Sequence, residues 1–200
     1  GIFEVCGLDS RIGSQFLRPG PGWGGSCFPK ETMGLERIAE EAAVAAPVLH
    51  AAIESNERRK RGLAARVARA LGGSVEHREI AVLGVAFKAG TDDVRESPAL
   101  TLIEALVARG ARVRVHDPAA TANAARVLDG IAVRWTTDLT TALAGAEACV
   151  VATEWPEYRA LTAGDFALQM AGDVVVDLRD HLSETLDRAA FTVDRLGRPR

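Results

Sequence analysis

A cysteine in a glycine-rich stretch is the residue whose surroundings best suit chemistry. Cys27 lies within Gly-Trp-Gly-Gly-Ser-Cys-Phe-Pro-Lys, residues 22–30, just ahead of a helix that we predict from about Lys30 to Ala43. The N–H groups and dipole at a helix N-terminus favour the thiolate form of a cysteine. Glycines let a substrate approach the backbone closely. The pattern favours a nucleophile, and the alternative is a structural cysteine buried in a turn, which the flanking glycines disfavour because they bury a thiol poorly.

The other cysteines are interpreted as packing residues. Cys149 lies inside the apolar run Ala-Cys-Val-Val-Ala, and Cys6 lies at the end of a short helical stretch. The 3 cysteines are widely spaced and form no C-x-x-C pair, so a disulfide framework and a structural zinc site are poorly supported. The 4 histidines have no metal-like spacing. We therefore expect no metal.

The composition is that of an ordinary soluble globular protein, with 48% hydrophobic and 26% charged residues. The net charge of -3 gives no basic field for nucleic acid. No apolar run approaches the ~20 residues that span a bilayer, and the N-terminus lacks a signal-peptide pattern. These observations predict a cytoplasmic protein without nucleic-acid or membrane partners.

Residues 1–73 are expected to form a helical segment that carries the cysteine loop. A helix from Pro47 to about Gly72 is predicted by apolar residues at helical spacing, such as Leu49, Ile53 and Leu63, with a charged opposite face that includes Lys60. A helix of about 25 residues is longer than most globular helices and needs a surface to lie against. A dimer interface or a bridge between domains would supply that surface.

Residues 74–200 are expected to form a second domain. Apolar strands alternate with amphipathic helices, which predicts a parallel sheet covered on both faces, the doubly wound α/β fold. The expected strands are 80–85, 113–116, 131–135, 148–152 and 174–177, and the expected helices are 100–109, 121–128, 139–143 and 166–170.

The ends of these strands carry polar and aromatic residues. Ligands of doubly wound sheets bind beyond the carboxyl ends of the strands, so these residues are candidates for contact with a ligand. The alternative is that polar residues merely terminate strands. The residues that follow the strands, here called the strand exits, are Phe87-Lys88, Asp117, Thr153-Glu154-Trp155 and Asp177-Leu178-Arg179.

Several blocks in this order resemble the UDP-glucose/GDP-mannose dehydrogenase family. Residues 7–13 and 22–30 are similar to its active-site stretch, and the remaining blocks to its nucleotide-sugar domain. Members that act on GDP-mannose usually have leucine after the cysteine, so Phe28 favours UDP-glucose. The blocks of the second domain are residues 82–88, 91–98, 115–118, 153–155 and 176–179.

The resemblance implies a UDP-glucose 6-dehydrogenase, which oxidises the sugar C6 alcohol to a carboxylate in two NAD-dependent steps. Cys27 is then the nucleophile that attacks the intermediate aldehyde, and a thiohemiacetal and a thioester follow. The alternatives are a GDP-mannose 6-dehydrogenase and a non-catalytic module for UDP-sugar binding or dimerisation. A receiver-like domain is disfavoured, because Asp92-Asp93 follows a loop and not a strand end.

Matching positions imply further roles. Glu31 stands where the family usually has an aspartate that activates water, and the alternative is an ordinary acidic residue in the first turn of a helix. Arg95 would reach the cofactor, with Asp92, Asp93 and Glu96 as candidates to hold it in place. Phe87 and Trp155 would either stack on a base or pack. The implied substrate-binding residues are Arg11 (toward the partner subunit's substrate), Phe16, Leu17, Gly24, Phe87, Lys88 and Arg179.

No G-x-G-x-x-G turn of a dinucleotide site follows a predicted strand, and Gly84 after the first strand does not supply one. The resemblance implies that the NAD-binding domain would lie before Gly1 and that a helix-loop unit is missing near Cys6-Gly7. We therefore expect this chain alone to bind UDP-sugars weakly and to transfer no hydride. We also expect a homodimer through the long helix.

Overall fold

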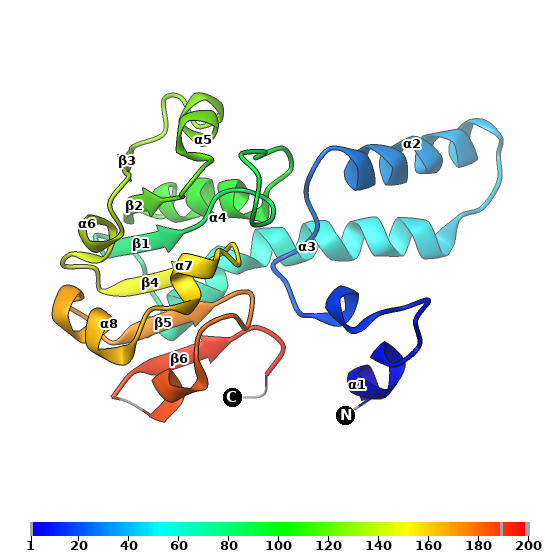
Figure 1. The fold of residues 1–200 in the computed structure, drawn as a ribbon. Coiled ribbons are helices and arrows are strands. Elements are labelled where there is room, and N and C mark those ends of the chain that lie inside the picture. The colour runs from blue at the N-terminus through cyan, green and yellow to red at the C-terminus, as the bar shows by residue number, and fades with distance from the viewer. Residues whose placement is uncertain (1, 189, 199–200) are drawn as a thin grey trace.

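The computed structural model describes residues 2–188 and 190–198, apart from the side chains of Phe3, Gln15, Phe16, Asp187 and Arg188. A six-stranded sheet with helices on both sides forms one unit, and helices near the N-terminus project from it (Figure 1). The N-terminal helical segments are α1 (Ile2–Gly7), η1 (Ser14–Leu17), α2 (Cys27–Glu41) and α3 (Pro47–Ala70).

All the strands of the sheet run parallel, in the order β3-β2-β1-β4-β5-β6. In its centre, Val82 of β1 pairs with Val115 of β2 and Val150 of β4. The strands are β1 (Glu79–Leu83), β2 (Arg112–His116), β3 (Val133–Thr136), β4 (Ala148–Val151), β5 (Val174–Asp177) and β6 (Thr192–Arg195). The helices are α4 (Pro98–Val107), α5 (Thr121–Val127), α6 (Leu139–Leu143), α7 (Pro156–Arg159), α8 (Ala163–Gln169) and η2 (Glu184–Arg188).

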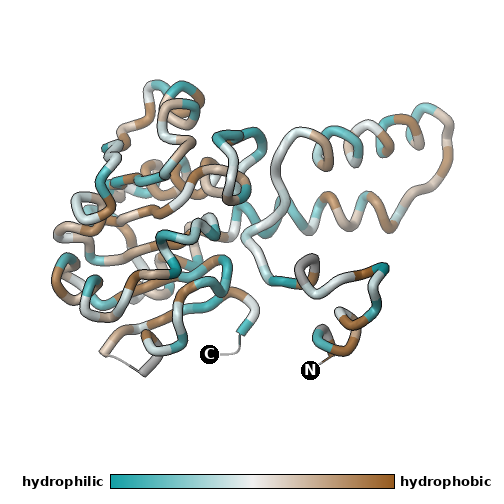
Figure 2. Tube along the Cα trace, in the orientation of Figure 1, coloured by the Kyte–Doolittle hydropathy of each residue, from teal (hydrophilic) through white to brown (hydrophobic). Residues whose placement is uncertain are grey.

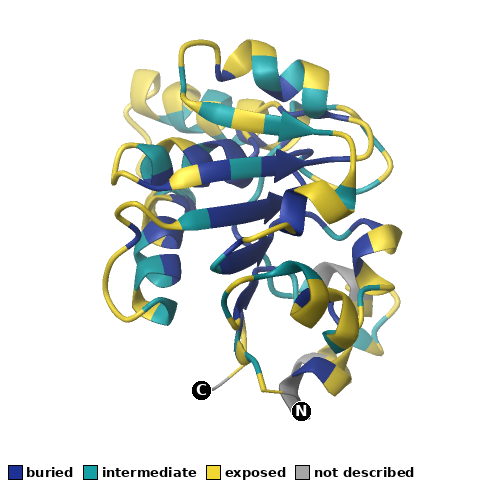
Figure 3. Cartoon of the chain, turned by 90° about the vertical axis from the view of Figure 1, so that its left-hand side faces the viewer, coloured by how far each residue is buried: buried dark blue, intermediate teal, exposed yellow. Residues whose placement is uncertain are grey.

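The central strands are buried on both faces, because helices cover each side of the sheet. Every residue of β4 and β5 is buried, as the dark strands of Figure 3 show. Helices α3 and α4 pack together over one face, and α6 and α8 pack over the other. Burying each Val or Leu side chain stabilises the fold by about 1.5–3 kcal/mol. Figure 2 shows the resulting hydrophobic strands.

The long helix α3 serves two parts of the molecule. Its second half belongs to the α/β core, where Leu63, Ala64 and Val67 are at most 2% exposed. Its first half extends away from the sheet, and α2 folds back along it (Figure 1). Val48 at its start is 82% exposed. The division of the chain at residues 73 and 74 stays a prediction, since α3 is shared between the two parts.

The expected fold class is confirmed, with a helical segment followed by a doubly wound parallel sheet. Four elements were not predicted, which are the strand β6, the short helix α7 and the 3-10 helices η1 and η2. β6 reads Thr-Val-Asp-Arg, which lacks an apolar run, and it lies at the edge of the sheet. α7 has 4 residues, too few for a helical period to appear.

The strand order reverses between β1 and β4, which is the point where doubly wound sheets bind ligands. The turn after β1 is tightly packed here. Gly84 has a φ of +92°, and a Cβ on it would lie 2.4 Å from the Cβ of Thr153, beyond β4. The sequence therefore needs glycine at this position for packing and backbone conformation.

We predict that Gly84→Ala lowers the free energy of unfolding by about 2–4 kcal/mol, the sum of a left-handed backbone penalty and overpacking. Urea unfolding would measure it. Gly62→Ala is the control, because no atom lies within 4 Å of a Cβ on Gly62 in α3. Removing a mid-helix glycine stabilises by about 0.5–1 kcal/mol. Equal effects of the two substitutions would contradict this account.

Candidate functional site

Cys27 is the first residue of α2, which begins earlier than the predicted start at Lys30. The thiol is exposed, and the Ser26 Oγ lies 3.6 Å from its Sγ. The Phe28 ring stands edge-on to the Trp23 ring, with centroids 5.1 Å apart. The structure thus places Cys27 at an open helix N-terminus, and the alternative of a cysteine buried in a turn is wrong.

The glycines before Cys27 let two loops touch. A Cβ on Gly24 would lie 2.5 Å from the Glu96 carbonyl oxygen, and one on Gly25 would lie 2.9 Å from the Phe87 ring. The Gly25 N–H donates to the Arg95 carbonyl at 2.8 Å. The cysteine loop is therefore docked on the segment between β1 and α4. This docking accounts for Gly24 through packing, whereas its role toward a substrate stays a prediction.

Two buried polar residues of α3 hold the same loop from below. The Asn56 side-chain oxygen accepts the Trp23 N–H at 2.9 Å, and Asn56 is 5% exposed. The Lys60 ammonium, with its side chain 4% exposed, lies 3.2 Å from Glu57 and 3.4 Å from Glu96. Sequence reasoning missed Asn56.

The sequence placed Lys60 on the charged face of α3 opposite its apolar residues, but the structure buries its side chain. The β1–α4 segment and Gly22 cover that side of the helix, and a Cβ on Gly22 would lie 3.3 Å from the Lys60 Cγ. A buried ammonium needs carboxylates as partners, and Glu57 and Glu96 supply them. The sequence does not show where these carboxylates lie, and in particular it does not show that Glu96 reaches the Lys60 ammonium.

Arg95 contacts the cysteine loop through its carbonyl, which accepts the Gly25 N–H, and its side chain is fixed by Asp93. Its Nε donates to Asp93 Oδ1 at 2.9 Å and its Nη2 to Oδ2 at 2.7 Å. Hydrogen bonding and charge from Asp93, and to a smaller extent the Cys27 sulfur, raise the pKa of Arg95. The Arg95 guanidinium lowers the pKa of Asp93 in turn. Of the three candidates, Asp93 holds Arg95, whereas Asp92 accepts from Asn123.

Arg179 bridges the strand exits on either side of the point where the strand order reverses. Its Nε donates to the Ala152 carbonyl at 3.0 Å and its Nη2 to the Phe87 carbonyl at 2.9 Å. The side chain is 16% exposed, and burial lowers the pKa of Arg179 although the carboxylate of Glu154 opposes that shift. Arg179 is therefore not a solvated charge. It lines a cavity of about 350 Å³ together with Arg18, Pro19, Glu154 and His181.

The turn after β1 does not suit the pyrophosphate of a dinucleotide. In dinucleotide sites, free N–H groups of this turn bind the pyrophosphate. Here Asp117 already accepts the N–H groups of Val85 at 2.7 Å and Ala86 at 3.0 Å, so an anion occupies these donors. Trp155 also donates to Asp117 at 3.1 Å and is 8% exposed, so it packs rather than stacks on a base. The described residues of this turn do not fit NAD.

The remaining candidates are more exposed. The Lys88 ammonium lies 5.3 Å from the centre of the Phe87 ring. Glu31 is exposed and lies four residues after Cys27, so the two share a face of α2. Glu31 is not in the first turn, which removes that explanation for an acidic residue there. Arg11 is paired with Asp9 at 2.6 Å and its side chain is 87% exposed.

Leu17 is half-buried at the end of η1, and the side chain of Phe16 lies outside the described residues. Among the residues that the structure describes, no cluster of three His, Cys, Asp or Glu side chains could hold a metal. In that same part of the chain, no helix is both long and apolar enough to cross a membrane.

The candidate site consists of the cysteine loop, the β1 and β4 exits and Arg179.

Comparison with known proteins bears on this site. Residues 81–184 match the model of the UDP-glucose/GDP-mannose dehydrogenase family, UDP binding domain, and residues 1–58 match the central domain of that family. Cys27 and the loop that carries it lie in the central-domain match, and Arg179 lies in the other.

Several of the similar proteins are named UDP-glucose dehydrogenases. The UDP-glucose 6-dehydrogenase of Rhizobium meliloti is 40% identical over 199 residues, which are 99% of this chain and 45% of that protein. TuaD, the UDP-glucose 6-dehydrogenase of Bacillus subtilis, is 39% identical and covered to 43%. The solved UDP-glucose dehydrogenase of Pyrobaculum islandicum is 37% identical, with a TM-score of 0.82 over 96% of this chain and 42% of that one. The chain thus spans less than half the length of the curated relatives that it matches.

We predict that Asn56→Ala loosens the cysteine loop. A buried N–H left without its acceptor costs about 1–3 kcal/mol. Amide hydrogen exchange should therefore lose roughly tenfold or more of its protection at Trp23, with a smaller loss at Gly25. Ser55→Ala, at the preceding position of α3, is the control. Unchanged protection in Asn56→Ala, or the same loss in the control, would show that Asn56 does not hold the loop.

Proposed function

The chain belongs to the UDP-glucose/GDP-mannose dehydrogenase family, and from this premise we propose that it is the cysteine-bearing and UDP-binding part of an NAD-dependent UDP-glucose 6-dehydrogenase. The observation that carries the proposal is the docking of the Cys27 loop on the exit of β1, beside the cavity that Arg179 lines. That arrangement brings a thiol and a cation to one edge of the sheet.

In the proposed reaction, Cys27 forms the covalent bond to the sugar. The thiolate adds to the C6 carbonyl carbon of the aldehyde, and the carbonyl oxygen takes a proton, which gives a thiohemiacetal. NAD, when bound, would accept the hydride in both oxidation steps, first from C6 of the alcohol to give the aldehyde and then from C6 of the thiohemiacetal to give the thioester. The last step is attack of water on the thioester carbon, which expels the thiolate and releases the carboxylate. A thiolate suits this step, because a thioester hydrolyses readily.

Glu31 is proposed to take the proton from that water. It shares a helix face with Cys27, and side chains four residues apart on a helix lie about 5–6 Å apart at their Cβ atoms. Its carboxylate is exposed and forms no hydrogen bond or ion pair with the described residues, so it is free to bind water. Glutamate is one methylene longer than the aspartate usual in the family, which extends its reach toward the thioester.

The substrate is proposed to lie along the sheet edge with its charged groups toward the cations. Lys88 would contact the diphosphate, since this residue is exposed and its ammonium lies over the Phe87 ring. Arg179 would hold the nucleoside end through the cavity it lines. Arg95 would reach the cofactor. The sugar nucleotide would be lined by Phe16, Leu17 and Gly24, with Arg11 reaching the substrate of the partner subunit.

A homodimer is part of the proposal. Apolar side chains that the chain itself leaves uncovered gather on α1, α2 and the start of α3, and a second copy would bury them. The proposed enzyme works in the cytoplasm. The exposed apolar residues of these helices are Ile2, Val5, Phe28, Met33, Leu35, Ile38 and Val48, and Leu8 and Val44 follow α1 and α2, each at least 50% exposed.

Calorimetric titration of this chain with UDP-glucose, with GDP-mannose as the comparison ligand, tests the proposal. We expect weak one-to-one binding of UDP-glucose and no binding of GDP-mannose. Lys88→Ala should weaken it about tenfold or more, because a hydrogen bond to a charged group contributes about 1.5–3 kcal/mol. Arg61→Ala, which removes an exposed charge on α3, should leave it unchanged.

Binding of neither nucleotide sugar, or equal binding of both, would contradict the proposal. So would an equal loss in Lys88→Ala and Arg61→Ala, because binding would then follow overall charge and not the proposed site.

A further inference from the structure

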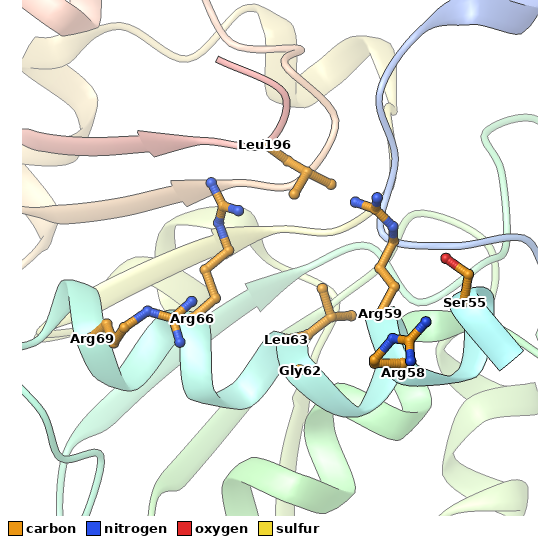
Figure 4. Close-up of a pocket in the computed structure, with 8 residues that line it drawn as sticks. All are labelled: Ser55, Arg58, Arg59, Gly62, Leu63, Arg66, Arg69 and Leu196. Atoms are coloured by element: carbon orange, nitrogen blue, oxygen red, sulfur yellow. The ribbon is translucent and has the colours of Figure 1, made fainter. Parts of the chain in front are cut away.

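A second cavity, of about 280 Å³, lies between α3 and the chain that follows β6. Figure 4 shows four arginines of α3 around it, Arg58, Arg59, Arg66 and Arg69, with Leu196 on the opposite side. Its lining shares no residue with the cavity at Arg179. It therefore needs an explanation of its own.

Half of the positive charge around this cavity is not neutralised. Arg58 pairs with Glu54 at 3.1 Å and Arg66 with Asp194 at 2.6 Å. Arg59 and Arg69 form no ion pair or hydrogen bond with the residues that the structure describes. A chain of net charge -3 thus concentrates uncompensated cations at one place, which attracts an anion.

One of the arginines is already fixed in position. The Arg66 Nη2 donates to Asp194 Oδ1 at 2.6 Å and to the Arg195 carbonyl at 3.0 Å, and the side chain is 19% exposed. A side chain that is already ordered loses little conformational entropy when a ligand binds. Arg66 therefore forms a rigid wall of the cavity.

The floor of the cavity is open at Gly62. No atom lies within 4 Å of a Cβ built on this residue, so packing gives no reason for glycine there. Glycine inside a helix destabilises by roughly 0.5–1 kcal/mol relative to alanine. The consequence of glycine at this position is space for a ligand between the arginines.

We propose that this cavity binds an oligophosphate, either inorganic or as part of a nucleotide. A guanidinium presents a planar fork of donors that matches phosphate oxygens. Arg58 and Arg69 are eleven residues apart, about 16 Å along a helix axis, a span that suits a chain of phosphates better than a single one. The apolar lining residues Leu63 and Leu196 are only 2% and 6% exposed, so phosphate groups are the main recognition element.

Titration of the chain with inorganic triphosphate at about 0.15 M salt, where long-range attraction is screened, tests the proposal. We expect saturable one-to-one binding. The double variant Arg59→Gln with Arg69→Gln should weaken it at least about tenfold, given the strength of hydrogen bonds to charged groups. Gly62→Leu should weaken it at least about fivefold without a change of charge.

The matched control is the double variant Arg61→Gln with Arg159→Gln. It removes the same charge at exposed arginines outside the cavity, and we expect binding within about twofold of the unchanged chain. ATP identifies the source, since equal affinity for ATP and triphosphate indicates phosphates alone and tighter ATP binding indicates a nucleotide.

Three results would overturn the proposal. These are no saturable binding of triphosphate or ATP, an equal loss of binding in the control, and tighter binding of an oligoglutamate peptide than of triphosphate. The thermal midpoint of each variant shows that the chain is folded during the measurement.

Discussion

The site depends on one close approach between two backbones. At Gly24 and Gly25 the cysteine loop touches the Glu96 carbonyl and the Phe87 ring with no room for a side chain. Because α2 begins two residues after Gly25, this contact decides where the Cys27 thiol lies relative to the sheet. Any side chain at Gly24 would push the thiol away from the strand exits.

Buried polar groups make this approach specific. Asn56, Lys60 and Arg179 each place a polar or charged group out of water and find partners on the cysteine loop or the strand exits. A buried polar group without its partners is costly, so only one arrangement of loop, helix and sheet satisfies all three. Asp117 acts in the same way on the turn after β1, where it accepts the Val85 and Ala86 N–H groups.

The sequence predicted those parts of the molecule whose pattern is local. Runs such as Val-Val-Val-Asp at β5 are apolar on both faces, which predicts a central parallel strand. Lys60 could not be placed, because a lysine in a charged run looks solvated until the segment that covers it is known. The same holds for Asp117, whose hydrogen-bond donors on the turn after β1 lie more than thirty residues away in the chain.

The central claim is that UDP-glucose lies against Cys27 on the edge of the sheet. The rate of alkylation of Cys27 by iodoacetamide, with and without UDP-glucose, tests it most directly. Cys6 is a second exposed cysteine in the same chain and serves as an internal control. The account predicts that saturating UDP-glucose slows modification of Cys27 and leaves Cys6 unchanged. Equal rates at Cys27 with and without the bound sugar nucleotide would contradict it.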